Sequence, residues 1–98
     1  MLTSADYAPA QTHFTAADYA AALQAFQRLS ARAPLETQPL AGLALCYFAL
    51  GKKPHARRLW KIVTSRDDRY LLPRFWRVDL AWPPAMQTTA AQVNALVV

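Results

Sequence analysis

Glycine and cysteine are scarce in this sequence, with two glycines and one cysteine among 98 residues. A glycine-rich phosphate-binding loop is therefore excluded. Cys46 by itself can form neither an intramolecular disulfide nor a cysteine metal cluster, and a single cysteine suits a reducing compartment. Because Cys46 stands in the most apolar stretch of the chain, we interpret it as a small buried hydrophobic residue.

Long apolar runs and targeting signals are also lacking. The longest uncharged apolar run, residues 40–50, is far shorter than the roughly 20 residues that a membrane-spanning helix needs. The chain does not open with a positively charged stretch followed by an apolar core, which is the pattern of a secretory signal. We therefore expect a cytoplasmic protein that does not span a membrane.

Patterns typical of catalysis or metal binding are missing as well. His13 and His55 stand far apart in connecting segments, and no nucleophile has an evident base beside it. Asp67 and Asp68 could act as paired carboxylates in acid–base chemistry, but a helix cap flanked by arginines explains them more simply. We therefore expect a protein that is not an enzyme and that has no metal site and no cofactor.

Hydrophobic residues are abundant, at 54% of the sequence, and many of them are alanine, which favours closely packed helices. A chain of this length makes one small domain, residues 1–98, with a marginal core. Apolar residues recur at helical spacing over residues 16–32, 39–50 and 54–65. Pro34 ends the first of these segments and Gly51 ends the second.

Capping patterns predict where the first long helix begins. Thr15 and Asp18 form a possible capping box, and Phe14 can pack against Tyr19 across the helix start. Before this point the chain contains Pro9, which interrupts a helix. We therefore expect at most one or two helical turns before Pro9.

The C-terminal part predicts two further helices. Asp67 or Asp68 can cap the first, and a Trp-Pro-Pro sequence ends it. Thr89 and Gln92 form a capping box for the second, over residues 88–98. The predicted apolar stripe of the first is Leu72, Phe75, Trp76 and Leu80.

The order of small and aromatic residues resembles the tetratricopeptide repeat, a helix-turn-helix unit. The resemblance implies an all-α fold of four to five short helices in antiparallel hairpins, with core hairpins over 14–64 and C-terminal helices over 67–98. It also implies that the first helix of the preceding repeat is missing or degraded. One complete repeat matches at Leu40, Leu43, Ala44, Tyr47, Gly51, Ala56 and Trp60, and the end of a preceding one at Ala22, Phe26, Leu29 and Pro34.

In this family the first helix of each pair lines a concave groove, which implies a role as a protein-interaction adaptor or small chaperone. An apolar groove suits an amphipathic helix of a partner protein, unless the chain's own N-terminal segment or C-terminal helix fills it. Chaperones of bacterial type III secretion are similar in size and repeat content. The positions that the resemblance places in the groove are Gln38, Ala41, Leu45, Phe48 and Ala49.

Positive charge is concentrated in residues 52–77, which carry a net charge of +7 while the remaining residues total −2. The basic patch consists of Lys52, Lys53, Arg57, Arg58 and Lys61. Together with interleaved aromatic residues it could form a nucleic-acid-binding module. Helical spacing instead favours aromatic side chains inside and a solvated basic face, which an acidic protein could bind. A homodimer formed through the apolar face is a further alternative to a hetero-complex.

Overall fold

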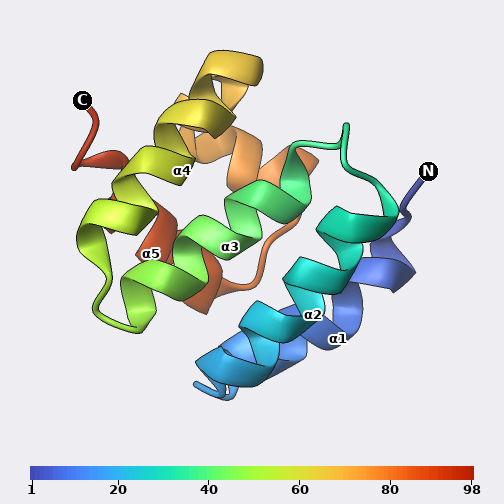
Figure 1. The fold of residues 1–98 in the computed structure, drawn as a ribbon. Helices are drawn as coiled ribbons and strands as arrows, with labels where there is room; N and C mark the ends of the chain where they lie inside the picture. Colours follow the sequence, from blue (N-terminus) through green and yellow to red (C-terminus); the bar gives the residue numbers. More distant parts are fainter.

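The computed structural model describes residues 1–98 and is all-α, as predicted (Figure 1). No helix is long and apolar enough to cross a membrane. A 3₁₀ turn, η1 (Asp68–Leu71), and a π-helical turn, η2 (Phe75–Asp79), lie between the fourth and fifth helices. The α-helices are α1 (Ser4–Thr15), α2 (Tyr19–Arg32), α3 (Gln38–Ala49), α4 (Lys53–Arg66) and α5 (Pro84–Asn94).

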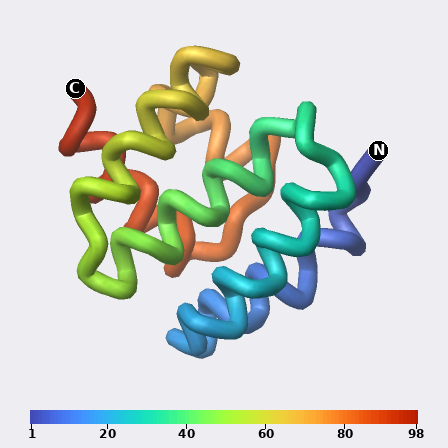
Figure 2. Tube along the Cα trace, in the orientation of Figure 1, coloured from blue at the N-terminus to red at the C-terminus, as the bar shows by residue number.

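Two antiparallel hairpins form the body of the fold, α1 with α2 and α3 with α4, and α2 packs against α3 to join them (Figure 1). After α4 the chain passes through η1 and η2 behind α3 (Figure 2). The last helix, α5, then returns across the molecule and contacts α1, α3 and α4. One continuous cluster of 21 buried residues links these elements.

The N-terminal segment forms a complete helix, so the prediction that Pro9 interrupts it is wrong. The 12 residues of α1 continue through Pro9, whose side chain is exposed. A proline inside a helix costs about 3 kcal/mol. Tyr7, Ala10 and Phe14 are buried on the other side of α1, and each large side chain buried contributes about 1.5–3 kcal/mol, which offsets that cost. The first hairpin is therefore complete.

The start of α2 also differs from the prediction. Thr15 ends α1, and the N-cap of α2 is Asp18, whose carboxylate accepts a hydrogen bond from the Ala21 backbone N–H at 3.3 Å. The predicted packing of Phe14 against Tyr19 is confirmed, with ring centroids 5.0 Å apart in an edge-on arrangement. This contact closes the turn between α1 and α2.

The second hairpin matches its prediction closely. Pro39 stands in the first turn of α3, where its missing N–H removes no helical hydrogen bond. Gly51 has a φ of +84°, the left-handed conformation that ends a helix and favours glycine. In α4 the buried residues are Ala56, Trp60 and Val63, which leaves the charged residues of that helix on the outside.

The C-terminal elements depart from prediction in their boundaries. Asp67 caps a short 3₁₀ turn, and the predicted helix after it is reduced to the π-helical turn η2. Leu72, assigned to the apolar stripe, is 58% exposed. The last helix begins at Pro84, so Thr89 lies inside it and donates a hydrogen bond to the Ala85 carbonyl at 3.1 Å instead of capping.

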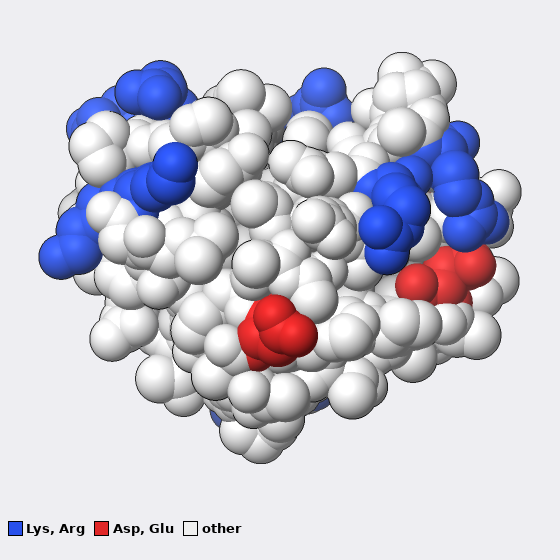
Figure 3. All heavy atoms as spheres, turned by 60° about the horizontal axis from the view of Figure 1, so that its bottom comes forward, with Lys and Arg blue, Asp and Glu red and all other residues white.

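Charged side chains are unevenly distributed over the surface (Figure 3). On the face drawn there, lysine and arginine gather on the left, which is the α4 side of Figure 1, and again on the right. Acidic side chains appear at the centre and on the right of this view, beside the second basic group. The basic group on the α4 side has no acidic neighbour on this face.

Candidate functional site

The groove predicted along α3 is closed in this structure. Ala41 and Leu45 are 0% exposed, and α5 is one of the helices that pack on α3. The buried side chains of α5 are Met86, Ala90 and Val93, which lie on one face of that helix. The expectation that Ala41 and Leu45 face an open groove is therefore wrong, and α5, the C-terminal helix, packs against α3. Leu45 cannot contact a partner in this structure.

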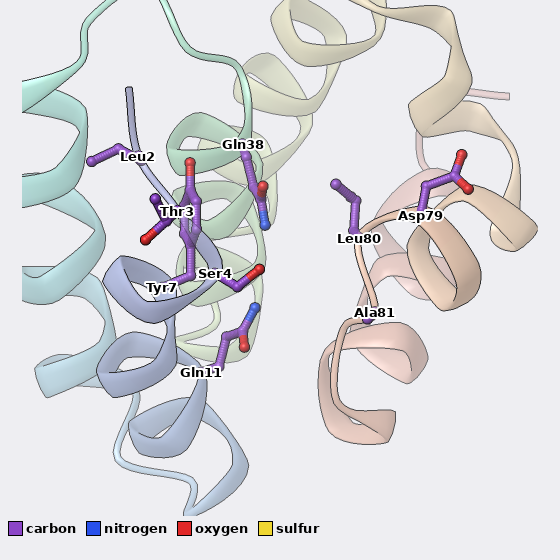
Figure 4. A pocket seen from close by; sticks show the side chains of 9 residues that line it. All are labelled: Leu2, Thr3, Ser4, Tyr7, Gln11, Gln38, Asp79, Leu80 and Ala81. Atoms are coloured by element: carbon purple, nitrogen blue, oxygen red, sulfur yellow. The ribbon is translucent and has the colours of Figure 1, made fainter.

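The other three predicted groove residues lie at the ends of α3 and are half-buried. Gln38, at the N-terminal end, lines a hollow of about 480 Å³ together with residues of α1 and of the segment after η2 (Figure 4). Phe48 and Ala49 lie at the other end of α3, beside the start of α4. The five residues therefore do not form one surface.

The hollow at Gln38 is lined mainly by uncharged polar groups. Ser4, Tyr7 and Gln11 project from α1 on one side, and Leu80 faces Gln38 across the opening (Figure 4). The carboxylate of Asp79 points away from it. Burial raises the pKa of Tyr7, and the neighbouring carboxylate of Glu36, which accepts a hydrogen bond from the Tyr7 hydroxyl at 3.2 Å, raises it further. This hollow therefore holds no charged group aimed at a ligand.

The predicted basic patch forms one exposed surface, which we call the basic face of α4. Its members are Lys52, Lys53, Arg57, Arg58 and Lys61, all exposed. The sequence of α4 contains no acidic residue. The structure has two ion pairs, Arg32 with Asp6 at 3.5 Å and Arg69 with Asp67 at 2.7 Å, and neither involves this face. These five cations thus have no acidic partner within the chain.

This arrangement of charge is unfavourable for α4 itself. Lys52 and Lys53 stand at the N-terminus of the helix, where the helix dipole disfavours positive charge by about 0.3–1 kcal/mol. Lys53, Arg57 and Lys61 follow one another at four-residue spacing, and like charges at that spacing repel by about 0.2–0.5 kcal/mol per pair. The stability of the isolated chain therefore does not explain the basic face.

A second hollow, of about 510 Å³, opens on the basic face. Lys53, Pro54, Arg57 and Arg58 line it from α4, and Leu96 lines it from the turn that follows α5. The Nε–H group of Arg57 donates a hydrogen bond to the Leu96 carbonyl at 3.1 Å. The C-terminal segment therefore completes this surface and orients one of its arginines.

The aromatic side chains interleaved with the basic residues are inside the protein. Trp60, Tyr70, Phe75 and Trp76 are between 0% and 7% exposed. The Nε1–H group of Trp60 donates to the Asn94 side chain at 3.0 Å, and that of Trp76 donates to the Tyr70 carbonyl at 2.9 Å. These rings are not available to stack on nucleic-acid bases.

Sequence reasoning identified the basic residues but missed Leu96 and the position of α5. Met86, Ala90 and Val93 stand four and three residues apart, a helical spacing that the sequence contains. Pro84 at the first turn is a start signal that could have placed α5 correctly. Comparison of the chain with protein families, with curated proteins and with solved structures finds no match.

Proposed function

We propose that this chain is a protein-interaction adaptor of tetratricopeptide-like construction that binds an acidic segment of a partner protein on the basic face of α4. The observation that carries the proposal is the unpaired state of Lys52, Lys53, Arg57, Arg58 and Lys61. The cations repel one another, and Lys52 and Lys53 oppose the helix dipole, so a ligand that supplies negative charge gains from both effects. A binding role, rather than an enzymatic one, accounts for this surface.

The paired hairpins support the tetratricopeptide-like part of the proposal. Ala22 and Ala56, the small residues that the repeat places where helices cross closely, are both 0% exposed. In this chain α5 packs against α3, and Ala41 and Leu45, which the resemblance assigns to the groove, are buried. We therefore place the partner on α4 instead of in the groove, and a chaperone-like role would use the same face.

An acidic protein fits this face better than a nucleic acid does. A single-stranded nucleic acid gains much of its affinity from bases stacked on aromatic rings, and the rings interleaved with the basic residues, those of Trp60, Tyr70, Phe75 and Trp76, are buried. Carboxylates of a flexible acidic segment need only exposed cations at variable spacing. The surface also includes the apolar side chains of Pro54 and Leu96, which a peptide can contact.

The test is a binding titration with a fluorescent peptide that contains about eight Asp and Glu residues, with an oligonucleotide of equal charge as the comparison. The variant Arg57→Glu, Arg58→Glu, Lys61→Glu reverses the basic face. Each exposed ion pair is worth about 0.2–1 kcal/mol. The variant loses three such ion pairs and adds repulsion between the new glutamates and the acidic peptide. We therefore expect it to weaken peptide binding about tenfold to a hundredfold.

The matched control reverses Arg28, Arg74 and Arg77, which are exposed, form no ion pair and lie outside α4. It changes the net charge by the same amount. Equal loss of peptide binding in both triple variants would show a general charge effect and contradict the proposal. Tighter binding of the oligonucleotide would favour the nucleic-acid alternative, and a stable dimer without peptide in sedimentation would favour self-association.

A further inference from the structure

We infer that the hollow between α4 and Leu96 selects, within an acidic partner segment, one large apolar side chain flanked by carboxylates. This inference rests on the proposed function and adds a specificity to it. A purely electrostatic face would bind any polyanion. The hollow adds an apolar contact at the centre of the charges, and such a contact distinguishes one acidic segment from another.

The lining of the hollow combines both kinds of contact. Pro54 and Leu96 are its apolar members, and Lys53, Arg57 and Arg58 are its charged members. Its volume of about 510 Å³ lies within the range of about 300–1,000 Å³ found for ligand pockets, so one large side chain fits easily. A peptide residue such as leucine can therefore lie against Leu96 while its acidic neighbours reach the three cations.

Arg57 is held in position for a carboxylate. Its Nε–H group is bonded to the Leu96 carbonyl at 3.1 Å, which fixes the plane of the guanidinium. The two terminal nitrogens stay available and can bind both oxygens of one carboxylate. Because the side chain is already ordered, less conformational entropy is lost when the ligand binds.

The neighbouring aromatic ring supports one of the cations that line the hollow. Lys53 Nζ lies 5.8 Å from the centroid of the half-buried Phe48 ring, within the range of a cation–π contact. Phe48 thus steadies Lys53 at the edge of the basic face. The apolar part of the hollow gains nothing from a phosphate backbone.

Two peptides that differ at one residue test this inference on the full chain. Both carry the same Asp and Glu residues, with a central leucine in one and a central serine in the other. We expect the leucine peptide to bind about tenfold more tightly, because a leucine side chain leaves water on binding. Leu96→Ala should remove most of this difference, whereas Ile62→Ala, which truncates an exposed apolar residue of α4 outside the hollow, should preserve it.

Arg57→Lys tests the orientation of the arginine, since it keeps the charge but loses the paired nitrogens. This variant should weaken the binding of both peptides by a similar factor of about three or more. If Leu96→Ala unfolds the chain, methyl shifts of Leu96 in the unaltered protein supply the second measurement, and they should move more with the leucine peptide than with the serine peptide.

The outcomes separate the two proposals. Equal affinity for the two peptides, both reduced by reversal of the basic face, would overturn this inference and leave the proposed function standing. Failure of either peptide to bind would overturn the proposed function and this inference with it. A preference for leucine that survives Leu96→Ala, with unmoved Leu96 methyl signals, would place the apolar contact elsewhere and also contradict the inference.

Discussion

The two hairpins approach each other closely at Gly42, and the structure specifies the outcome of Gly42→Ala. Gly42 is buried in the middle of α3, and a Cβ atom added there would overlap the ring of Phe26 on α2. Phe26 is 1% exposed, so its ring is enclosed by the core and cannot turn aside freely. The substitution therefore forces α2 and α3 apart or displaces the ring.

Two opposing effects set the size of the change. Alanine is favoured over glycine inside a helix by about 1 kcal/mol. Overpacking a core costs about 1–3 kcal/mol, and an overlap this deep with an aromatic ring belongs at the upper end. We therefore expect a net loss of about 2 kcal/mol in the free energy of unfolding. For a domain of this size that loss lowers Tm by roughly 8–16 °C.

Urea denaturation followed by circular dichroism measures this loss, and a double-mutant cycle with Phe26→Leu identifies its cause. The smaller side chain makes room for the new methyl group, so the double variant should lose less stability than the two single variants together, by at least about 1 kcal/mol. Gly51→Ala is the contrasting variant, because its Cβ meets no atom within 4 Å and its cost comes from the φ of +84° alone. A Gly42→Ala protein as stable as the unaltered chain, or strict additivity with Phe26→Leu, would refute the packing of α2 on α3 described above.

Two further predictions concern the C-terminal half and the buried ionisable groups. Asn94→Ala leaves the indole N–H of Trp60 without its hydrogen-bond partner and should lower the free energy of unfolding, measured by urea denaturation, by about 2 kcal/mol. Gln92→Ala, on the exposed side of α5, should change it by less than about 0.5 kcal/mol. Equal effects would contradict the role of Asn94 as the acceptor for Trp60. Burial raises the pKa of the Cys46 thiol from 9.0 to about 12 and also raises the pKa of the Tyr70 phenol above its usual 10.0. Both groups keep their protons in the folded state at pH values where the unfolded chain loses them, so the free energy of unfolding should fall as pH rises above about 9. Cys46→Ala should reduce this dependence, and a free energy of unfolding that stays constant through alkaline pH would contradict it.

Much of the fold follows from local features of the sequence. Gly51 and the helical spacing of apolar residues over 39–50 and 54–65 predicted the second hairpin, and the structure confirms it. These signals act over one or two turns of chain, through fixed φ angles and the side on which apolar residues stand. The all-α class and the exposure of the basic residues of α4 could be predicted from the sequence for the same reason.

Helix boundaries depended on contacts between distant segments. Helix α1 continues through Pro9 because Tyr7 and Phe14 are buried against the rest of the protein. No short stretch of the sequence shows this gain in free energy from burial. The cap at Asp18 replaced the predicted one at Thr15 because α1 continues as far as Thr15. In both places tertiary packing outweighed a local preference of a few kcal/mol at most.

The candidate site divides in the same way. The sequence by itself determined which residues carry the positive charge and that they stand on the outer side of α4, because charge and helical spacing are local properties. Only the tertiary structure decided that Leu45 is buried, and that Leu96 comes to lie beside Arg57, 39 residues away along the chain. The physical reason is that burial and long-range contacts depend on how helices pack against one another, and many arrangements of the same amphipathic helices satisfy the same local pattern.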